Sequence, residues 1–366
     1  MTVSEGVLHG CANVAGKEPQ ITVVVTVHNA EAYVRQCLNS LAAQDTQCFH
    51  LVVVDDGSTD NSLNLCRTII NQAGVSSVLK KLPHGGVAKA RNYGLEQVNT
   101  EYVLFLDCDD WLEPDTISSL LELLRKDRPE LAVFGFYYAM MDGKQYPVSS
   151  SKVRSMFSRE SIRRQFVSLW SSGLMYSSCN KIFQVKLLRE NGIVFQERSF
   201  GEDFEFCKDV MRVCSRLVIS DRCLYHYTCH ISGSLSTAYR EDLFEIRLKE
   251  HCGFVDYFRE LGCMDEHASE FLARRHIERV VGCVENECSP ASQKSIRERL
   301  RRIRIMLDEE NTRLSAEEAH LTSLRMKLLV LPIRKKWYCL TMLSGYVMTF
   351  CRNHMPEFFT WLKMSR

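Results

Sequence analysis

The sequence predicts an α/β protein in which helices flank an open, mostly parallel, Rossmann-like sheet, followed by a helical extension at the C-terminal end. Three features lead to this prediction. Apolar, β-branched runs alternate with segments of helical periodicity along the first 106 residues. Acidic residues recur where the predicted strands end. From residue 240 onward the periodicity is helical.

The first three elements form a strand-helix-strand unit. Residues 21–27 are a continuous β-branched run, as expected of a parallel strand that is buried on both faces. Apolar residues at helical spacing predict a helix over 31–43, and residues 49–54 form a second buried strand. This order of elements is the basic unit of a parallel sheet.

The same alternation continues through the next four elements. The apolar face over 63–70 predicts a helix, 75–82 a weaker strand, 88–97 a helix and 102–106 a fourth strand. Ligands of such sheets bind outside the carboxyl ends of the strands. The residues that follow each strand are therefore the candidates for a functional site.

The rest of the chain is less regular. We expect strands over 131–140 and 218–227, helices over 156–169 and 201–213, and loops over 142–155 and 176–181. Three parts result from this reading: a flexible N-terminus over 1–19, a sheet-containing domain over 20–238 and a helical region over 239–366.

The charge of the whole chain gives no sign of a nucleic-acid partner, because 46 basic and 45 acidic side chains leave a net charge of +1. The segment 321–366 differs. It carries eight basic residues against Glu357 alone, a net +7, among many apolar residues. Such a segment suits a surface that meets phosphate, RNA or anionic lipid. Its longest uncharged run, 337–351, would span only about 22 Å as a helix, too short for a membrane crossing.

The sixteen cysteines are scattered, mostly within apolar runs, and no two have a C-x-x-C spacing. The first 20 residues also lack the cationic start and apolar core of a signal peptide. We therefore expect reduced thiols in a cytoplasmic protein, many of them small core residues.

Three acidic clusters follow predicted elements and carry the candidate chemistry: Asp55-Asp56, Asp107-Cys108-Asp109-Asp110 and Glu202-Asp203. Asp107 and Asp109, two residues apart at a strand end, can direct oxygens at one hard cation. The alternative is a turn in which an aspartate caps the next helix. Asp56 can likewise accept a hydrogen bond from a nucleobase or cap a turn, and both readings stay open.

Two further residues complete the candidate set. Arg91 follows the pair Gly85-Gly86 and can place its planar guanidinium against a diphosphate. Asp203 lies at a predicted helix N-terminus, where the helix dipole favours its ionised form, so it is either a proton acceptor or a helix cap. No G-x-G-x-x-G pattern is present, which argues against a dinucleotide-dependent dehydrogenase.

Taken together, the segments resemble the inverting family 2 glycosyltransferases with a GT-A fold, in particular bacterial enzymes that build surface polysaccharides. The resemblance covers about residues 20 to 238, and the segments that carry it are 23–31, 53–60, 85–95, 105–111 and 200–203. It implies a metal-dependent transfer of a sugar, with a UDP-hexose as the expected donor. The expected acceptor is a hydroxyl of a glycan or lipid-linked saccharide in capsule, O-antigen or exopolysaccharide synthesis.

The resemblance also implies roles for single residues. Donor-binding residues are Thr26, Asn29, Glu31 and Asp56 at the nucleoside, Arg91 near the diphosphate, and Asp107. Asp109 and Asp107 would bind Mn²⁺ or Mg²⁺, and Asp203 would be the catalytic base. With such a base, attack opposite the leaving nucleotide turns an α-linked donor into a β-linked product.

Two departures from the family pattern concern these contacts. Thr26 and His28 stand where a proline and an aromatic residue are usual, and the loop over 227–230 lacks the usual arginine. His230 either replaces that arginine as a phosphate or metal contact, or the contact is absent.

Beyond about residue 240 the resemblance stops. The basic, aromatic stretch Lys335-Lys336-Trp337-Tyr338 is expected either to lie on the inner leaflet of the membrane or to belong to an appendage that packs on the catalytic domain or on a second subunit. Two alternatives to a glycosyltransferase remain: an inactive nucleotide-sugar-binding scaffold and a sugar-phosphate nucleotidyltransferase.

Overall fold

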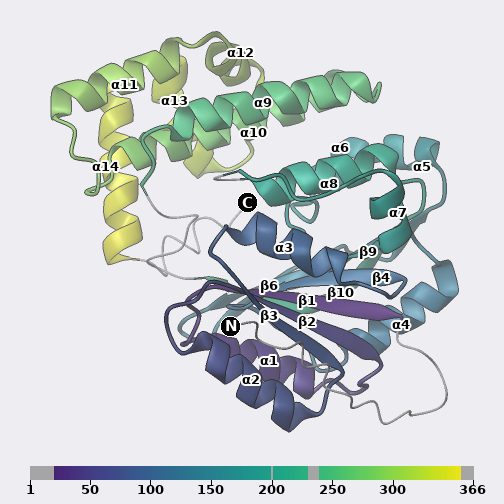
Figure 1. Cartoon of the computed structure of the whole chain (residues 1–366). Helices are drawn as coiled ribbons and strands as arrows, with labels where there is room; N and C mark the ends of the chain where they lie inside the picture. Colours follow the sequence, from purple (N-terminus) through teal and green to yellow (C-terminus); the bar gives the residue numbers. More distant parts are fainter. Residues whose placement is uncertain (1–19, 199–200, 230–238, 356–366) are drawn as a thin grey trace. The chain divides into compact units, whose positions relative to one another are not determined.

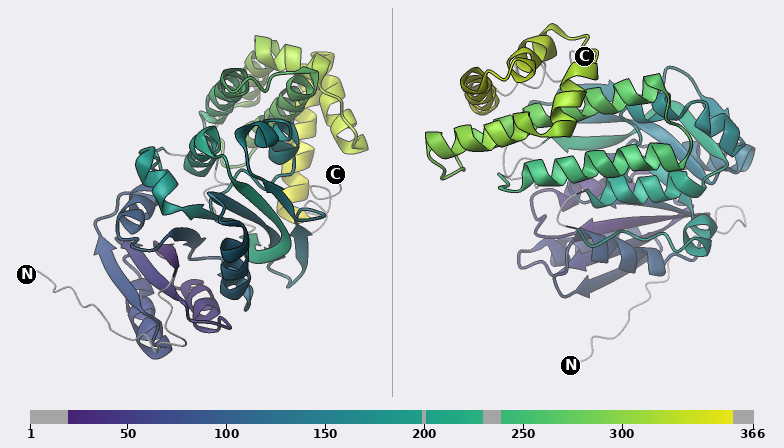
Figure 2. Two further views of the ribbon diagram at one scale, coloured as in Figure 1. Left: turned by 90° about the vertical axis from the view of Figure 1, so that its right-hand side faces the viewer. Right: turned by 90° about the horizontal axis from the view of Figure 1, so that it is seen from above.

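The computed structural model describes residues 20–198, 201–229 and 239–355, and the chain divides into two compact units, Met1–Cys229 and His230–Arg366. The first unit contains the sheet, and the described part of the second consists of helices (Figures 1 and 2). The predicted flexible N-terminus, 1–19, lies outside the described residues.

A parallel half of the sheet contains the first four strands in the order β3-β2-β1-β4. They are β1 (Ile21–Val27), β2 (Phe49–Asp56), β3 (Ser77–Leu82) and β4 (Tyr102–Asp107). Every residue of β1 is buried, as its continuous β-branched sequence predicts. The predicted parallel arrangement is therefore confirmed in this half.

Helices cover both faces of these strands (Figure 1). α1 (Val34–Ala42), α2 (Ser62–Ala73) and α4 (Thr116–Asp127) share one hydrophobic core with alternate residues of β1, β2 and β4. α3 (Val87–Glu96) lies on the opposite face, against β1 and β2. A side chain at Gly94 would place its Cβ 2.3 Å from Cγ1 of Val24, so glycine is required for this close approach.

The other half of the sheet is mixed. β6 (Leu131–Met140) and β10 (Leu217–Cys229) are parallel neighbours, and β9 (Lys181–Gln184) joins them to the first half by running antiparallel to both β4 and β6. Short antiparallel strands complete it: β5 (Trp111–Leu112) and β8 (Arg154–Met156) on β10, and β7 (Gln145–Val148) on β6.

The predicted single helix over 156–169 is wrong. Met156 pairs with Leu217 in β8, and two short helices follow, α5 (Arg159–Arg163) and α6 (Phe166–Ser171). Ser158 sets the start of α5, because its side chain accepts a hydrogen bond from the Ser161 backbone and caps the helix. The loops expected over 142–155 and 176–181 are also wrong in part, since β7, β8 and the start of β9 lie there.

Aromatic packing fixes the helix that carries the predicted base. α7 (Val185–Glu190) is followed along the chain by α8 (Glu202–Val213). Phe206 of α8 stacks on Phe195 with ring centroids 4.0 Å apart, and Phe195 contacts Phe105 of β4 edge-on at 5.0 Å. This packing holds the N-terminal turn of α8 near the carboxyl end of β4.

The described part of the second unit is a bundle of six helices. They are α9 (Leu243–Glu260), α10 (Glu266–Glu287), α11 (Ile296–Asp308), α12 (Glu310–Glu318), α13 (Leu324–Arg334) and α14 (Tyr338–His354). The central helix α10 contacts each of the other helices, and it contributes more residues to their shared core than any other helix does. Among the described residues, no helix has the length and apolar character needed to cross a membrane.

Candidate functional site

The carboxyl ends of β1, β2 and β4 bring together candidate residues that are far apart in the sequence. β1 lies between the other two strands, and the register pairs Val27 with Asp55 and Thr26 with Asp107. Asp56 ends β2, and Asp107 ends β4. The acidic clusters therefore share one edge of the sheet, where ligands of open α/β sheets bind.

Arg91 lies at the centre of the site and is only 3% exposed. One guanidinium nitrogen, Nη2, is 2.8 Å from Oδ1 of Asp107. The other, Nη1, lies 3.2 Å from Oδ1 of Asp203 and 3.3 Å from Oε1 of Glu202. A single buried arginine thus joins the predicted donor-binding carboxylate at the end of β4 to the predicted base at the start of α8.

Two residues that the sequence analysis did not predict hold these carboxylates. The Ser178 hydroxyl donates a hydrogen bond to Oδ1 of Asp203, and the Cys179 thiol donates one to Oδ2 of Asp107 at 3.1 Å. Burial raises the pKa of Cys179 well above its usual value, so the thiol keeps its proton. No motif marks these residues, because they lie in a short stretch that the sequence assigned to a loop.

The charges of the site act unequally on its acidic groups. Burial alone would raise the pKa of Asp107, but the charge of Arg91 and the hydrogen bonds from Arg91 and Cys179 outweigh it and lower that pKa. The pKa of Glu202 is raised, first by burial and then by the charge of Asp203. Glu202, the neighbour of Asp203, therefore gives up its proton less readily than an ordinary glutamic acid.

The segment after β4 contains two further carboxylates with different surroundings. Asp110 is 2% exposed and accepts hydrogen bonds from the Tyr225 hydroxyl and from the Thr228 backbone, the latter at 2.7 Å. Its pKa is well above the usual value because of burial first and the charges of Asp109 and Asp107 next. Asp109 is half-buried. Asp110 is thus fixed between β4 and β10.

A divalent cation fits this donor set. Asp107, Glu202 and Asp203 gather around the single guanidinium of Arg91, and Asp109 follows Asp107 by two residues, so carboxylates outnumber the cationic group. Both oxygens of Asp107 already accept hydrogen bonds, from Arg91 and from Cys179. Asp107 is therefore held in place through both of its carboxylate oxygens.

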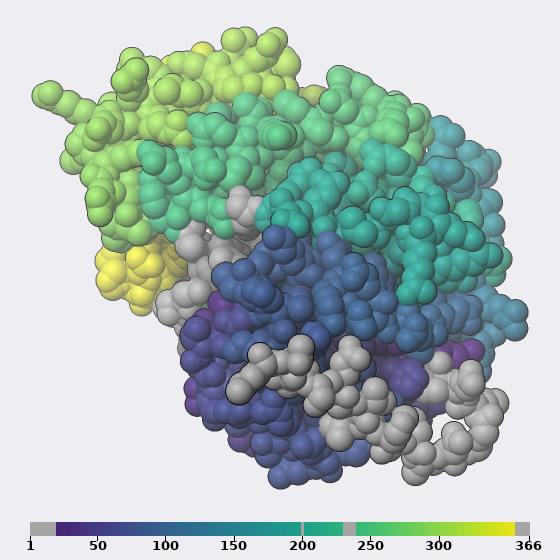
Figure 3. Space-filling view, in the orientation of Figure 1, coloured from purple at the N-terminus to yellow at the C-terminus, as the bar shows by residue number. Residues whose placement is uncertain are grey.

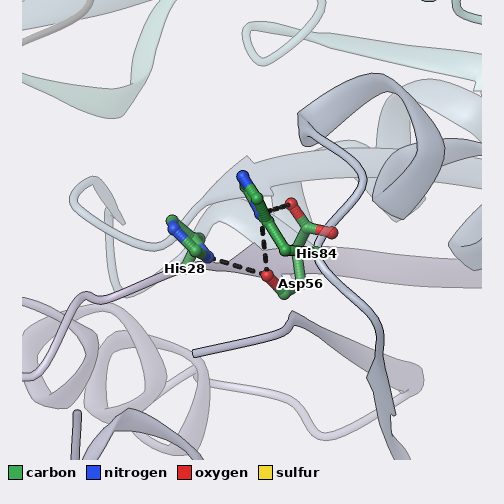
Figure 4. Close-up of side chains that lie close together, drawn as sticks. All are labelled: His28, Asp56 and His84. Carbon is green, nitrogen blue, oxygen red and sulfur yellow. Dashed lines mark hydrogen bonds and ion pairs between the residues drawn. The ribbon is translucent and has the colours of Figure 1, made fainter. Parts of the chain in front are cut away.

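A second cluster lies where β1, β2 and β3 end and contains His28, Asp56 and His84 (Figure 4). The two imidazole rings stack with centroids 4.2 Å apart and planes 21° apart. Nδ1 of His28 is 2.7 Å from the Asp56 carbonyl oxygen, and Nδ1 of His84 is 2.9 Å from Oδ2 of Asp56. Because these atoms of Asp56 are acceptors, both rings are expected to carry their proton on Nδ1.

The carboxylate of Asp56 is already satisfied by protein groups. Oδ1 accepts from the Gly85 backbone at 2.8 Å, and Oδ2 accepts from the Gly86 backbone at 2.9 Å. Possible ligand atoms of His28, Asp56 and His84 lie within 4.8 Å of one another. The stacked rings and the occupied carboxylate nevertheless suit a flat aromatic ligand better than a metal ion.

Local backbone geometry shapes this second cluster. Gly57 has a φ of 70°, and a Cβ there would lie 2.6 Å from the backbone nitrogen of His84, so only glycine fits the turn after β2. Asn29 has a φ of 47° and accepts a hydrogen bond from the Thr59 backbone at 2.8 Å. Asparagine tolerates this left-handed conformation better than most residues.

The other predicted nucleoside contacts are placed nearby but differ in their surroundings. Thr26 is 7% exposed and lies beside Asp107 in the register of β1 and β4. Glu31 is exposed and accepts a hydrogen bond from the Asn61 backbone at 3.2 Å, which ties it to the start of α2. His230 lies outside the described residues.

An aromatic column stands beside the acidic segment. Trp111 stacks on His226 with centroids 4.8 Å apart, and Tyr137 stacks on the same ring at 4.9 Å. His226 also lies 2.8 Å from the carboxylate of Glu113. Trp111 and Tyr137 are both partly exposed, so the column offers aromatic surface next to Asp109 and Asp110.

Residues 22–192 match the family model described as Glycosyl transferase family 2. The chain is 30% identical over 263 residues to the poly(ribitol-phosphate) beta-N-acetylglucosaminyltransferase TarS of Staphylococcus aureus, a match that covers 70% of this chain and 44% of TarS. It is 28% identical over 233 residues to the glycosyltransferase GlyA of Streptococcus pneumoniae, covering 61% of this chain and 32% of GlyA. The chain thus spans less than half the length of these relatives.

The fold is also similar to a solved structure. The crystal structure of residues 1–349 of S. aureus TarS in complex with UDP-GlcNAc aligns with a TM-score of 0.61 and 22% sequence identity, covering 90% of each chain. At this identity, the likeness concerns the fold.

Proposed function

Since the chain belongs to glycosyl transferase family 2 and has a GT-A fold, we propose that it transfers a hexose from a UDP-sugar to a hydroxyl group of a bacterial surface polysaccharide or its lipid-linked precursor. The named activity of TarS supports an N-acetylhexosamine as the sugar and a sugar-alcohol phosphate polymer as one class of acceptor. Capsule, O-antigen and exopolysaccharide chains are the other classes of acceptor that fit.

One observation carries this proposal: Arg91 holds Asp107 and Asp203 on the two nitrogens of one guanidinium. Transfer with inversion needs a donor site and a base on opposite sides of the anomeric carbon. Asp107 is at the end of β4, and Asp203 is at the start of α8, so the two carboxylates approach the same space from different elements. A site of this kind suits group transfer better than simple binding.

The residues of the second cluster support a nucleobase contact. The stacked rings of His28 and His84 offer an aromatic face, and Asp56 and its hydrogen-bond partners line the adjoining edge. His28 would take the role that an aromatic residue has in similar sequences. A pyrimidine base stacked on this pair would point its ribose and diphosphate toward Arg91 and the acidic segment.

The reaction then follows from the placement of the side chains. Asp203 takes the proton from the acceptor hydroxyl, whose oxygen attacks the anomeric carbon as the bond to the nucleotide breaks. Ser178 and Arg91 orient the Asp203 carboxylate. The sugar ring of the acceptor would stack on Trp111. When bound at Asp109, Mn²⁺ or Mg²⁺ would neutralise the leaving diphosphate as a Lewis acid.

Calorimetric titration with UDP-, GDP- and dTDP-sugars tests the donor assignment. We expect a UDP-sugar to bind most tightly in the presence of Mn²⁺, and chelation of the metal to weaken it. In the presence of Mn²⁺, the affinity of Asp109→Asn for the donor should equal that of the native chain without metal, because a proposed cation ligand is lost. The proposal fails if no nucleotide sugar binds with Mn²⁺ present, or if Asp109→Asn keeps the full metal dependence.

A further inference from the structure

The last described helix, α14, packs on the bundle with one face and carries large apolar side chains on the other. Its inner face packs on α10, where a Cβ at Gly345 would lie 2.7 Å from Sγ of Cys288 and the Thr349 hydroxyl donates to the Glu285 carbonyl at 3.2 Å. Large apolar side chains recur on the outer side every three or four residues. This outer face consists of Trp337, just before the helix, and Leu340, Leu343, Val347 and Phe350.

All five side chains of this outer face are between 44% and 57% exposed. Part of α14 is visible at the molecular surface in the space-filling view (yellow in Figure 3). The preceding helix repeats the pattern, because Leu324, Leu328 and Leu331 are exposed at helical spacing while Val330 and Ile333 are buried. Exposed apolar faces of this kind generally mark an interaction site.

The charge around these helices indicates what the surface binds. No acidic residue occurs from 321 to 355, whereas six basic residues do. Three of the six are engaged within the bundle: Arg334 donates to the Ala316 and Ala319 carbonyls, Lys336 pairs with Asp308, and Arg352 pairs with Glu285.

Two exposed lysines remain available to a partner. Lys327 and Lys335 make no ion pair within the described part of the chain, and Lys335 lies at the junction of α13 and α14, two residues before Trp337. Lysine beside tryptophan and leucine is typical of segments that lie at the interface between water and lipid.

A second copy of the chain fits this surface poorly. In a symmetric dimer the same patch would face itself, which would bring Lys327 and Lys335 of both copies together without a carboxylate on either helix to pair with them. Anionic headgroups supply the missing negative charge, and the acyl region accepts the apolar side chains.

We propose that the outer face of α14, together with the exposed leucines of α13 and with Lys327 and Lys335, binds the surface of a bilayer that contains anionic lipid. α14 has 17 residues, about 25 Å of helix, and would lie in the plane of the interface. The inference rests on the exposed surface alone and is independent of the proposed reaction.

Vesicle flotation of the full chain tests this proposal without any activity measurement. We expect the native chain to float with vesicles of phosphatidylcholine and phosphatidylglycerol, and to float weakly with phosphatidylcholine alone or at high salt. The double variant Leu343→Glu, Val347→Glu should lower the partition coefficient at least about tenfold, because it places charge in the apolar stripe. Lys327→Glu with Lys335→Glu should lower it about tenfold on anionic vesicles only.

A matched control is Leu314→Glu in α12, where the leucine is 53% exposed but lies outside these two helices. It should float like the native chain. The proposal is overturned if the native chain does not float with anionic vesicles, or if the α14 variant floats unchanged. It is also overturned if sedimentation shows a native dimer that the α14 variant dissociates, since the apolar face would then belong to a second copy.

Discussion

Asp203→Asn is expected to lower the rate of sugar transfer, and of slow donor hydrolysis, by about 10²- to 10⁴-fold. Asparagine can still accept the hydrogen bonds from Ser178 and Arg91, so the side chain should keep its position. Asparagine cannot, however, take the proton from the hydroxyl group of the acceptor sugar. Donor affinity, measured by calorimetry, should therefore change by less than about threefold while the rate falls.

Two variants of α8 serve as controls for this result. Glu205→Gln removes another carboxylate of the first turn, one that pairs with Lys208 at 3.0 Å, and should leave the rate unchanged. Glu202→Gln removes the neighbouring carboxylate, whose pKa burial and Asp203 raise, and should cost less than Asp203→Asn. If Glu202→Gln abolished transfer and Asp203→Asn did not, Glu202 would be the base.

Removal of the Arg91 side chain has the second large expected effect. Arg91→Leu would leave Asp107, Glu202 and Asp203 close together without their shared cation. Breaking a buried ion pair from one side costs about 3–5 kcal/mol, so the free energy of unfolding in urea should fall by about that amount. The side chain of Arg91 is 3% exposed, so solvent screens little of this loss.

Arg91→Lys tests catalysis apart from stability. It also provides a folded variant if Arg91→Leu does not fold. Lysine keeps the charge but lacks the fork that reaches Asp107 and Asp203 together. We expect a folded protein with a clearly lower transfer rate. Arg222→Leu, which breaks an exposed pair with Asp115, should change stability by no more than about 1 kcal/mol. An Arg91→Lys variant with native activity would contradict the central role of the fork.

The parallel half of the sheet could be predicted because its strands are buried on both faces. A strand such as β1, with no polar position except threonine, has few alternatives, and the polar residues that follow it mark the ligand edge. The same reasoning selected Asp107 and Asp203 as candidates, since each lies at the end or start of a regular element.

Other features of the site depend on pairing between distant segments. β9 has four residues and is recognisable only once β4 and β6 lie on either side of it. Ser178 and Cys179 lie three and two residues before that strand, so their contacts with Asp203 and Asp107 could not be read from local sequence. The stack of His28 on His84 likewise joins two turns that are far apart along the chain.

The most direct test of the central claim is the anomeric configuration of the sugar that the native chain releases or transfers. The tightest-binding UDP-sugar, α-linked to its nucleotide, is incubated with the protein and Mn²⁺ and followed by proton NMR from the first minutes. The proposed attack from the face opposite the nucleotide predicts that the β-anomer appears first and that Asp203→Asn suppresses it. Initial release of the α-anomer would contradict the account, and binding without any release of sugar would favour an inactive scaffold.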